Sequence, residues 1–362
     1  MEITDIRNYS LEELEKIFQQ WRLPGYHARQ VFSWIYRKQA GSFEAMTNLS
    51  LDLRSRLKER FVFKRLELVP PSEARRDPAS LTISGKKLRE SRDGTKKFLF
   101  RLEDGNLIES VLIPVKERLT ACLSSQAGCP FSCGFCASGI AGFKRNLESG
   151  EMTGQLLEIR RELGPDKALT NVVFMGTGET LDNYDNVLKA IRTINSRNGF
   201  NIGARRITIS TCGIIPGIKR LSAEGLQIEL SVSLHAADDK TRTRLMPVNK
   251  KYPLKDLISA CKEYASVTKR QVTFEYVLIK GLNCSKEAAD NLIGLLAGWE
   301  CKLNLLVYNP VKEFPYQPAD EREIEFFIWL LRKQRIMVTM RRSRGKDIEG
   351  ACGQLRLKGR LP

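Results

Sequence analysis

Short apolar runs alternate with segments of helical spacing through most of the chain. Six runs of strand length lie at residues 120–125, 170–176, 205–211, 226–234, 271–279 and 302–308. Helical spacing separates or follows them at residues 151–162, 184–195, 214–223, 253–266, 285–297 and 320–333. This alternation favours a parallel sheet, and unbroken apolar strands are typical of a sheet covered on both faces. We therefore predict an α/β fold with a partial (β/α)6 barrel, because a closed barrel of this kind needs eight strands.

The first part of the chain has a helical pattern of its own. Ser10 precedes LEELEKIFQQW and Glu13 follows three residues later, which is the pattern of a capping box. Two more segments of helical character follow at residues 26–39 and 50–61. We predict a small N-terminal helical accessory domain over residues 1–64, which either binds nucleic acid or serves as a scaffold.

The next fifty residues change to the alternation of short strands. Turn signals occur at residues 92–95 and 103–105, and LTISG at residues 81–85 is one of the candidate strands. We predict a short antiparallel β-rich linker between the two larger units. The predicted parts of the chain are residues 1–64, the linker 65–114, the barrel core 115–347 and a C-terminal tail 348–362.

The charge of the chain is strongly positive and unevenly distributed. Among 362 residues, 59 Lys and Arg outnumber 42 Asp and Glu, for a net charge of +17. Basic residues cluster at residues 58–65, Arg75–Arg76, Lys144–Arg145, Arg205–Arg206 and 340–346. Clustered positive charge favours a polyanionic partner, and nucleic acid is the first candidate. The opening MEITDIRNYS lacks the pattern of a signal peptide, and no apolar run has membrane-spanning length, so we expect a cytoplasmic protein without a membrane partner.

Three cysteines form the most specific motif of the chain. Cys129, Cys133 and Cys136 stand in a C-x3-C-x2-C array, and Pro130 and Gly134 within it indicate a loop. Structural zinc sites use four protein ligands. Three thiolates on a 4Fe–4S cluster instead leave one iron open, which the amino and carboxylate groups of S-adenosylmethionine (SAM) could chelate. The array therefore resembles the radical-SAM signature. A zinc knuckle with a distant fourth ligand is the alternative, although the chain has only two His and no second CxxC motif.

Small and polar residues follow four of the predicted strands. They are Gly176 to Glu179, Ser210 and Thr211, Ser233 to His235, and Asn309. Functional residues of parallel barrels collect beyond the carboxyl ends of strands, so we expect a cofactor pocket there. The ordinary polarity of loops would explain any one of these positions. It explains less easily why all of them occur in a chain that also carries a cysteine array.

Two cysteines outside the array lie in notable places. Cys122 is on the first predicted barrel strand, and Cys352 lies in the glycine-flanked sequence KDIEGACGQL near the C-terminus. A thiol on a mobile loop beside basic residues can be held as a nucleophilic thiolate. The alternative is that each is a small buried hydrophobic residue, which we also expect of Cys212, Cys261, Cys284 and Cys301.

Together these motifs resemble the RlmN/Cfr family of radical-SAM adenine methyltransferases. The resemblance rests on CLSSQAGCPFSCGFCASG, GFKRNL, TNVVFMGTGE, ITISTCGIIP, SLHA, MPVNKKY, FEYVLI, YNP and RGKDIEGACGQL, in family order. YHARQVFSWIY and FEAMTNLS also resemble the helical accessory domain of that family. One departure is Thr180, which stands where the family usually has Pro.

The resemblance implies one [4Fe-4S] cluster on Cys129, Cys133 and Cys136, with SAM as the second cofactor. The positions that match the family's SAM contacts are Gly178, Glu179, Ser210, Ser233, Leu234, His235 and Asn309. Cys352 matches the cysteine that a first SAM methylates. A second SAM gives a 5′-deoxyadenosyl radical, which takes hydrogen from the S-methyl group so that its carbon adds to the adenine. Cys122 matches the cysteine that releases the RNA by forming a disulfide with Cys352, and Glu109 matches the proposed proton acceptor.

The implied substrate is carbon 2 of adenine 2503 in 23S rRNA, together with adenine 37 of some tRNAs. An electron donor of the flavodoxin or ferredoxin type is implied as a further partner. Methylation of carbon 8 of the same rRNA base is one alternative, and a non-catalytic, metal-containing RNA-binding protein is another. Methylthiolation would require a second cluster motif, which the sequence lacks. The long N-terminal region and the ACGQL context favour carbon 2.

Overall fold

The computed structural model describes residues 3–70, 88–334 and 336–356. Its helices are α1 (Leu11–Gln20), α2 (Gly25–Tyr36), α3 (Leu51–Arg60), α4 (Ser149–Leu163), α5 (Tyr184–Asn195), α6 (Ile215–Ser222), α7 (Asp239–Leu245), α8 (Leu254–Thr268), α9 (Lys286–Leu296) and α10 (Glu321–Lys333). Its strands are β1 (Thr4–Asp5), β2 (Phe61–Val62), β3 (Glu67–Leu68), β4 (Arg89–Glu90), β5 (Lys96–Arg101), β6 (Leu107–Val115), β7 (Arg118–Cys122), β8 (Gln126–Ala127), β9 (Arg145–Asn146), β10 (Asn171–Phe174), β11 (Ile207–Thr211), β12 (Glu229–Ser233), β13 (Val272–Leu278), β14 (Lys302–Val307) and β15 (Met337–Arg341).

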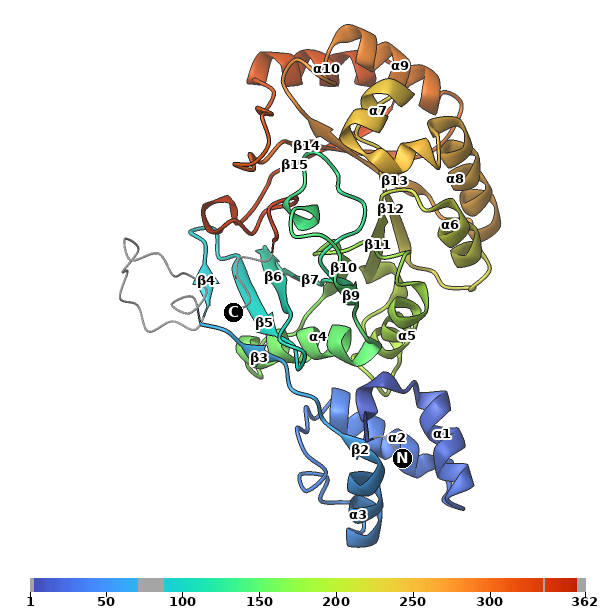
Figure 1. The fold of residues 1–362 in the computed structure, drawn as a ribbon. Helices are drawn as coiled ribbons and strands as arrows, with labels where there is room; N and C mark the ends of the chain where they lie inside the picture. The colour runs from blue at the N-terminus through green and yellow to red at the C-terminus, as the bar shows by residue number, and fades with distance from the viewer. Residues whose placement is uncertain (1–2, 71–87, 335, 357–362) are drawn as a thin grey trace.

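The large sheet runs in the order β15-β14-β13-β12-β11-β10-β7-β6-β5-β3, with β4 also paired to β5. All neighbours from β7 to β15 are parallel. Within the described residues, six strand–helix units follow one another: β7–α4, β10–α5, β11–α6, β12–α8, β13–α9 and β14–α10. The predicted partial (β/α)6 barrel is thus confirmed, and the helices lie along the outside of the sheet (Figure 1).

Two elements of the barrel were not predicted. The strand β15 pairs with β14 at the end of the sheet, and its residues alternate between exposed and half-buried. An edge strand of this kind lacks the continuous apolar run that marks the other parallel strands. The short helix α7 was also missed, because its sequence DKTRTRL has almost no apolar residues.

The antiparallel strands β3 to β6 extend the same sheet rather than forming a separate layer. The strand β6 is hydrogen-bonded to β7 on one side and to β5 on the other. Figure 1 shows the C-terminal segment, residues 345–356, close to β4 and β6, and the Glu349 carbonyl accepts from Lys97 Nζ of β5 at 3.1 Å. The candidate strand at residues 81–85 and the basic pair Arg75–Arg76 lie outside the described residues.

The N-terminal helices form a module with its own hydrophobic core, to which Leu157 of α4 contributes. The predicted capping box is present, since Ser10 Oγ accepts from the Glu13 N–H at 3.2 Å and the Glu13 carboxylate accepts from the Ser10 N–H at 2.7 Å. It caps the first turn of α1 and confirms the predicted start of that helix.

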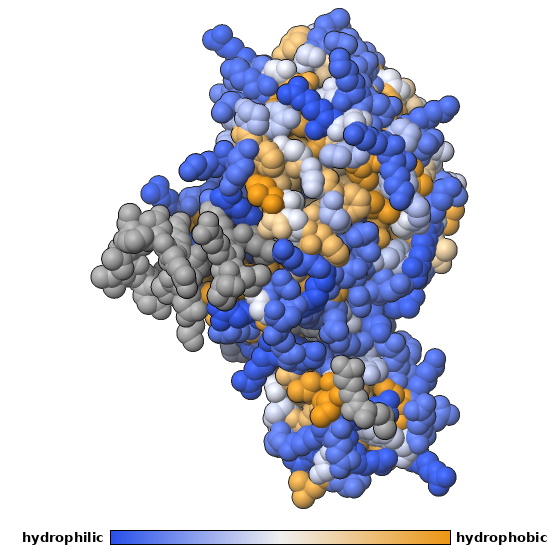
Figure 2. Space-filling model, viewed as in Figure 1, coloured by the Kyte–Doolittle hydropathy of each residue, from blue (hydrophilic) through white to orange (hydrophobic). Residues whose placement is uncertain are grey.

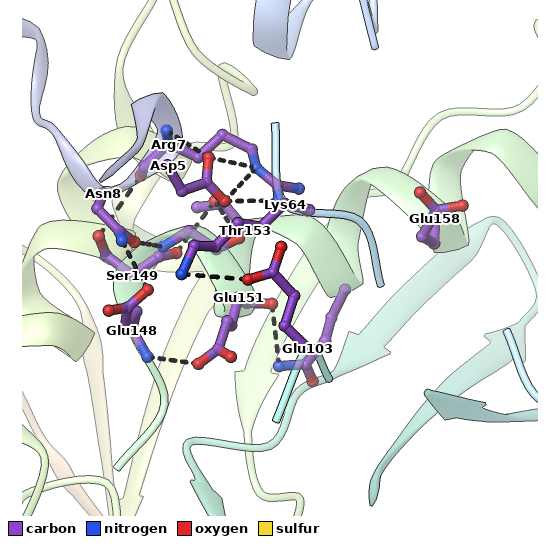
Figure 3. A network of polar contacts seen from close by, with 12 residues as sticks. Asp5, Arg7, Asn8, Lys64, Glu103, Glu148, Ser149, Glu151, Thr153 and Glu158 are labelled. Carbon is purple, nitrogen blue, oxygen red and sulfur yellow. Dashed lines mark hydrogen bonds and ion pairs between the residues drawn. The ribbon is translucent and has the colours of Figure 1, made fainter. Parts of the chain in front are cut away.

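A polar network joins this module to the first turn of α4 (Figure 3). Asp5 and Arg7 form a buried ion pair at 2.7 Å, and Asn8 Oδ1 accepts from the Gly150 N–H at 2.8 Å. A Cβ at position 150 would lie 2.6 Å from Asn8 Oδ1, so glycine permits this close approach. Because charges and backbone groups are buried together here, the module and the barrel form one packed unit. Among the described residues, no helix has both the length and the apolar character that a membrane span requires.

Candidate active site

A cavity of about 160 Å³ opens at the carboxyl ends of the parallel strands. The cysteine loop, the ends of β10 to β14 and the C-terminal segment all contribute to its wall. Figure 2 shows hydrophobic surface over this part of the barrel, bordered by hydrophilic residues. The predicted site residues that line it are Cys129, Cys133, Cys136, Gly178, Glu179, Ser210, Ser233, His235, Asn309 and Cys352. Strand ends far apart in the sequence therefore meet in one place, as the parallel topology requires.

The three array cysteines share one wall of the cavity. Burial raises the pKa of the Cys133 thiol well above its ordinary value, and the neighbouring Cys136 and Cys129 raise it further. The same desolvation raises the pKa of Cys129 to about 12. The thiols of Cys129 and Cys136 therefore lie within electrostatic range of Cys133. Among the described residues, no three His, Cys, Asp or Glu side chains converge as ligands of a single metal ion.

Glu179 lies in the loop after β10, where backbone N–H groups hold its carboxylate. The two carboxylate oxygens of Glu179 accept from the Leu181 N–H at 3.0 Å and from the Cys212 N–H at 2.7 Å. Burial raises the pKa of this carboxyl, while the hydrogen bonds from the Cys212 backbone oppose that rise. Gly178 has φ 109°, and a Cβ there would lie 2.6 Å from the Gln126 side chain. Thr180, which stands where the family has Pro, donates its hydroxyl to the Phe174 carbonyl at 3.2 Å and so braces the loop.

His235 and Asn309 approach the cavity from the ends of β12 and β14, the two strands that flank β13 in the sheet. His235 has φ 57°, and its Nδ1 accepts from the Val277 N–H at 3.1 Å. Burial and the nearby Arg242 lower the pKa of His235 to about 3, which keeps the imidazole neutral. The Asn309 Nδ2 donates to the Cys352 carbonyl at 3.1 Å, and its buried Oδ1 has no hydrogen-bond partner among the described residues.

The C-terminal segment is docked rather than free. The Ala137 N–H donates to the Gly353 carbonyl at 2.8 Å, and Ser138 Oγ donates to the Leu355 carbonyl at 2.9 Å. Cys352 is exposed at the cavity mouth, yet desolvation raises the pKa of its thiol to about 11 although Arg341 lowers it. The loop that carries Cys352 is therefore docked on the cysteine loop, and the nucleophilic role of Cys352 stays a prediction.

Three predicted site residues do not line the cavity. Cys122 is buried on β7, where it packs with Val111 and Leu355. Burial raises the pKa of its thiol to about 12, and the neighbouring Cys352 adds to the rise, so the two thiols lie within electrostatic range. Glu109 is buried in an ion pair with Lys97 at 2.9 Å. Leu234 is fully buried, and its carbonyl accepts from Arg242 Nε at 3.2 Å.

Comparison with known proteins identifies the family. The model of the radical SAM superfamily matches residues 123–292, and that of the ribosomal RNA large subunit methyltransferase N-terminal domain matches residues 4–63. The chain is 44% identical to the "Probable dual-specificity RNA methyltransferase RlmN" of Thermoanaerobacter sp. (strain X514), over 98% of each chain. A protein of the same description from Dictyoglomus turgidum is 44% identical over 98% of this chain and 97% of its own.

The chain belongs to the RlmN family of radical-SAM RNA methyltransferases.

A solved structure agrees with this assignment. The crystal structure of a radical SAM methyltransferase from Sphaerobacter thermophilus superposes with a TM-score of 0.88 at 41% identity, covering 97% of this chain and 99% of that one. The fold and the family resemblance inferred from the motifs are therefore both confirmed.

Membership of the radical-SAM superfamily implies a 4Fe–4S cluster and SAM, and the residues of the cavity fit both groups. Three thiols face it without a fourth protein ligand in their motif. The unpartnered Asn309 Oδ1 offers an acceptor for a ligand's donor group.

Sequence reasoning missed Glu275, whose carboxylate also lines the cavity. Its Oε1 accepts from Ser231 at 2.8 Å and lies 3.3 Å from Arg341 Nη1, whereas its buried Oε2 has no partner among the described residues. The signal was present, because Glu275 is the one charged residue in the apolar run QVTFEYVLI. A carboxylate in the middle of a buried strand requires a partner or a role.

Proposed function

We propose that this chain methylates carbon 2 of an adenine in 23S rRNA, adenine 2503, and adenine 37 of some tRNAs. Support for an RNA substrate comes from the family, whose members matched here are described as dual-specificity RNA methyltransferases. Support for carbon 2 over carbon 8 comes from the full-length similarity to proteins with the RlmN description, including the N-terminal domain.

The observation that carries the proposal is the position of Cys352. Its backbone is held by Asn309, and its thiol stands at the mouth of the cavity that Cys129, Cys133 and Cys136 line. In the proposed cofactor arrangement, the three array thiols bind the cluster, and Glu179, Ser210, Ser233, Leu234, His235 and Asn309 surround SAM beside Gly178. When bound there, the cluster would supply the electron that starts the radical chemistry.

Cys352 would first accept a methyl group. Its thiol loses a proton, the sulfur forms a bond to the methyl carbon of SAM, and the bond from that carbon to the sulfonium breaks with its electron pair left on the departing thioether. Arg341 favours this step because its charge lowers the pKa of the thiol.

Cys122 would release the RNA after the methyl carbon has joined the adenine. Its thiolate attacks the Cys352 sulfur, an S–S bond forms, and the bond between that sulfur and the RNA-linked carbon breaks. The electron pair stays on the carbon, which takes up a proton and becomes the methyl group. A thiol reductant must then supply two electrons to restore both cysteines. Before this release, the radical adduct would lose the proton of the adenine carbon, for which Glu109 is the proposed acceptor, and one electron, which would return to the oxidised cluster.

The proposed macromolecular partners are 23S rRNA, tRNA and an electron donor of the flavodoxin or ferredoxin type. Basic residues at 58–65 and 340–346 would contact phosphates, although Lys58 and Lys64 also pair with Glu44 and Glu103. Phosphate contacts release counterions, so RNA affinity should fall steeply as salt rises.

Mass spectrometry of nucleosides tests the proposal. The cluster-loaded enzyme should convert an adenine of a 23S rRNA fragment to 2-methyladenosine, and a Cys352→Ala variant should give no product. An 8-methyladenosine product would establish the carbon-8 alternative instead. Equal methylation by the Cys352→Ala variant would remove the carrier from the mechanism.

A further inference from the structure

A buried ion pair lies under the C-terminal segment, on the strands that extend the barrel sheet. Lys97 of β5 and Glu109 of β6 are each 5% exposed, and Lys97 Nζ lies 2.9 Å from Glu109 Oε1. The antiparallel register pairs Lys97 with Val111 and Leu99 with Glu109, so the two charges are diagonal neighbours on one face. The same face carries Val111 and Cys122, which are also register partners.

Both members of the pair also hold the backbone of the C-terminal segment. Lys97 Nζ donates to the Glu349 carbonyl at 3.1 Å, and Glu109 Oε2 accepts from the Arg356 N–H at 2.9 Å. These two contacts fall on either side of Cys352, three residues before it and four residues after it. The stretch between them, which carries Cys352 to the cavity mouth, is thus fixed at both of its ends.

We propose that Lys97 and Glu109 are a latch: a pair of positioning residues that holds the Cys352 loop against the active-site cavity by its backbone on both sides of the cysteine.

Because the ion pair is buried, the latch is stable only when both Lys97 and Glu109 are present. Desolvation lowers the pKa of Lys97 and raises the pKa of Glu109, while the mutual attraction of the pair opposes both shifts. Removing one charge leaves the other buried without compensation, which is strongly unfavourable. The C-terminal segment supplies part of this burial, so the loop and the ion pair stabilise each other in the docked position.

The latch also constrains Glu109. In the docked loop both carboxylate oxygens are occupied, one by Lys97 and the other by the Arg356 N–H. Both donors lower the pKa of Glu109, so loss of the Arg356 N–H when the loop undocks would make this carboxylate a stronger proton acceptor. The consequence for catalysis rests on the proposed carrier role of Cys352. The latch would hold the cysteine near the methyl donor, and the loop would undock before the cysteine-bound carbon reacts with the RNA.

Hydrogen–deuterium exchange on the full-length protein tests the latch directly. In a Lys97→Met variant, amides of residues 349–356 should exchange roughly tenfold or more faster, the factor expected when a hydrogen bond to a charged group is lost. Lys96→Met is the matched control, because Lys96 neighbours Lys97 on β5 but pairs with Glu162 in a more exposed position. It should leave the exchange of this segment unchanged.

A double variant separates the latch from a general effect on folding. Lys97→Met with Glu109→Leu replaces the ion pair by apolar groups, which often preserves stability. The variant should unfold at a denaturant concentration similar to that of the parent and still show fast exchange in residues 349–356, with exchange in β10 to β13 unaltered. Parent-like protection of the segment in both variants, or a rise spread over the whole barrel, would overturn the latch.

A second measurement tests whether the latch positions Cys352 for methylation. The fraction of Cys352 that carries a methyl group in protein isolated from cells should drop in the Lys97→Met variant and not in the Lys96→Met control. Faster exchange with unchanged methylation would show that the pair holds the loop but does not position the cysteine, and would overturn the positioning role. An unmethylated Cys352 in the parent protein would instead count against the proposed function, and the exchange data would still decide whether the pair holds the loop.

Discussion

The Gly178→Ala variant tests whether the packing of the chain beside the proposed SAM site leaves room for a side chain at position 178. The residue has φ 109°, and a Cβ would lie 2.6 Å from the Gln126 Cβ and 2.7 Å from the Gln126 nitrogen. Because one of these neighbours is backbone, no side-chain rotation can relieve the contact. Backbone strain costs about 1–3 kcal/mol and overpacking a similar amount, so we expect a loss of about 2–6 kcal/mol in the free energy of unfolding.

Gly105 provides the matched control for this change. It also has a positive φ, 81°, but a Cβ there meets nothing within 4 Å. Gly105→Ala should therefore cost only the left-handed backbone strain, about 1–2 kcal/mol. The entropy that alanine removes from the unfolded chain is similar in both variants and cancels in the comparison.

Two assays follow from this reasoning. Urea denaturation should rank Gly178→Ala well below Gly105→Ala in stability. Equilibrium dialysis with SAM should show a clear loss of affinity in Gly178→Ala alone, because the Glu179 N–H donates to Gln126 Oε1 at 2.8 Å and would move with the displaced loop. Equal stability and equal SAM affinity of the two variants would refute the close packing on which the site rests.

Three further predictions concern charges. Asp5→Ala leaves Arg7 buried without its partner and should cost about 3–5 kcal/mol in urea denaturation, whereas Glu15→Ala, which breaks the exposed pair with Arg29, should cost less than about 1 kcal/mol. Glu275→Gln should lower the pKa of the Cys352 thiol and Arg341→Met should raise it, as measured by the pH dependence of alkylation, because these two charges act on that thiol in opposite directions. Burial holds the pKa of His235 at about 3 against an ordinary 6.5, so the unfolded state binds the extra proton and stability should fall as the pH drops from 6.5 towards 3. The slope contributed is at most about 1.4 kcal/mol per pH unit, and a His235→Asn variant, whose side chain tolerates the positive φ, should show a shallower decline.

Much of the fold follows from local patterns in the sequence. The capping box at Ser10 is specified within four residues, and the six apolar strands follow from continuous runs that only a covered parallel sheet can bury. The cavity residues could be predicted because the carboxyl ends of parallel strands lie at the same edge of a sheet. This holds whatever the sequences of the connecting helices are. In contrast, β15 has the alternating exposure of an edge strand, and its position depends on pairing with β14.

The arrangement of the C-terminal segment could not be read from spacing. Cys352 was identified from its sequence context, but its raised pKa results from docking against the cysteine loop more than two hundred residues earlier. Glu109 likewise reads as one acidic residue in an apolar strand, and its engagement by Lys97 and the Arg356 N–H depends on the β5–β6 register and on the path of the tail. Long-range contacts of this kind are set by the whole fold and leave no local pattern.

The central claim is that Cys352 carries the methyl group and Cys122 releases the RNA. The most direct measurement is a denaturing gel of Cys122→Ala protein purified from cells, run with and without ribonuclease, together with the mass of the peptide that contains Cys352 in the parent protein. We predict an RNA-linked species that ribonuclease shortens, and a methyl group on the parent's Cys352. A Cys122→Ala protein free of RNA and a parent with an unmodified Cys352 would contradict the mechanism.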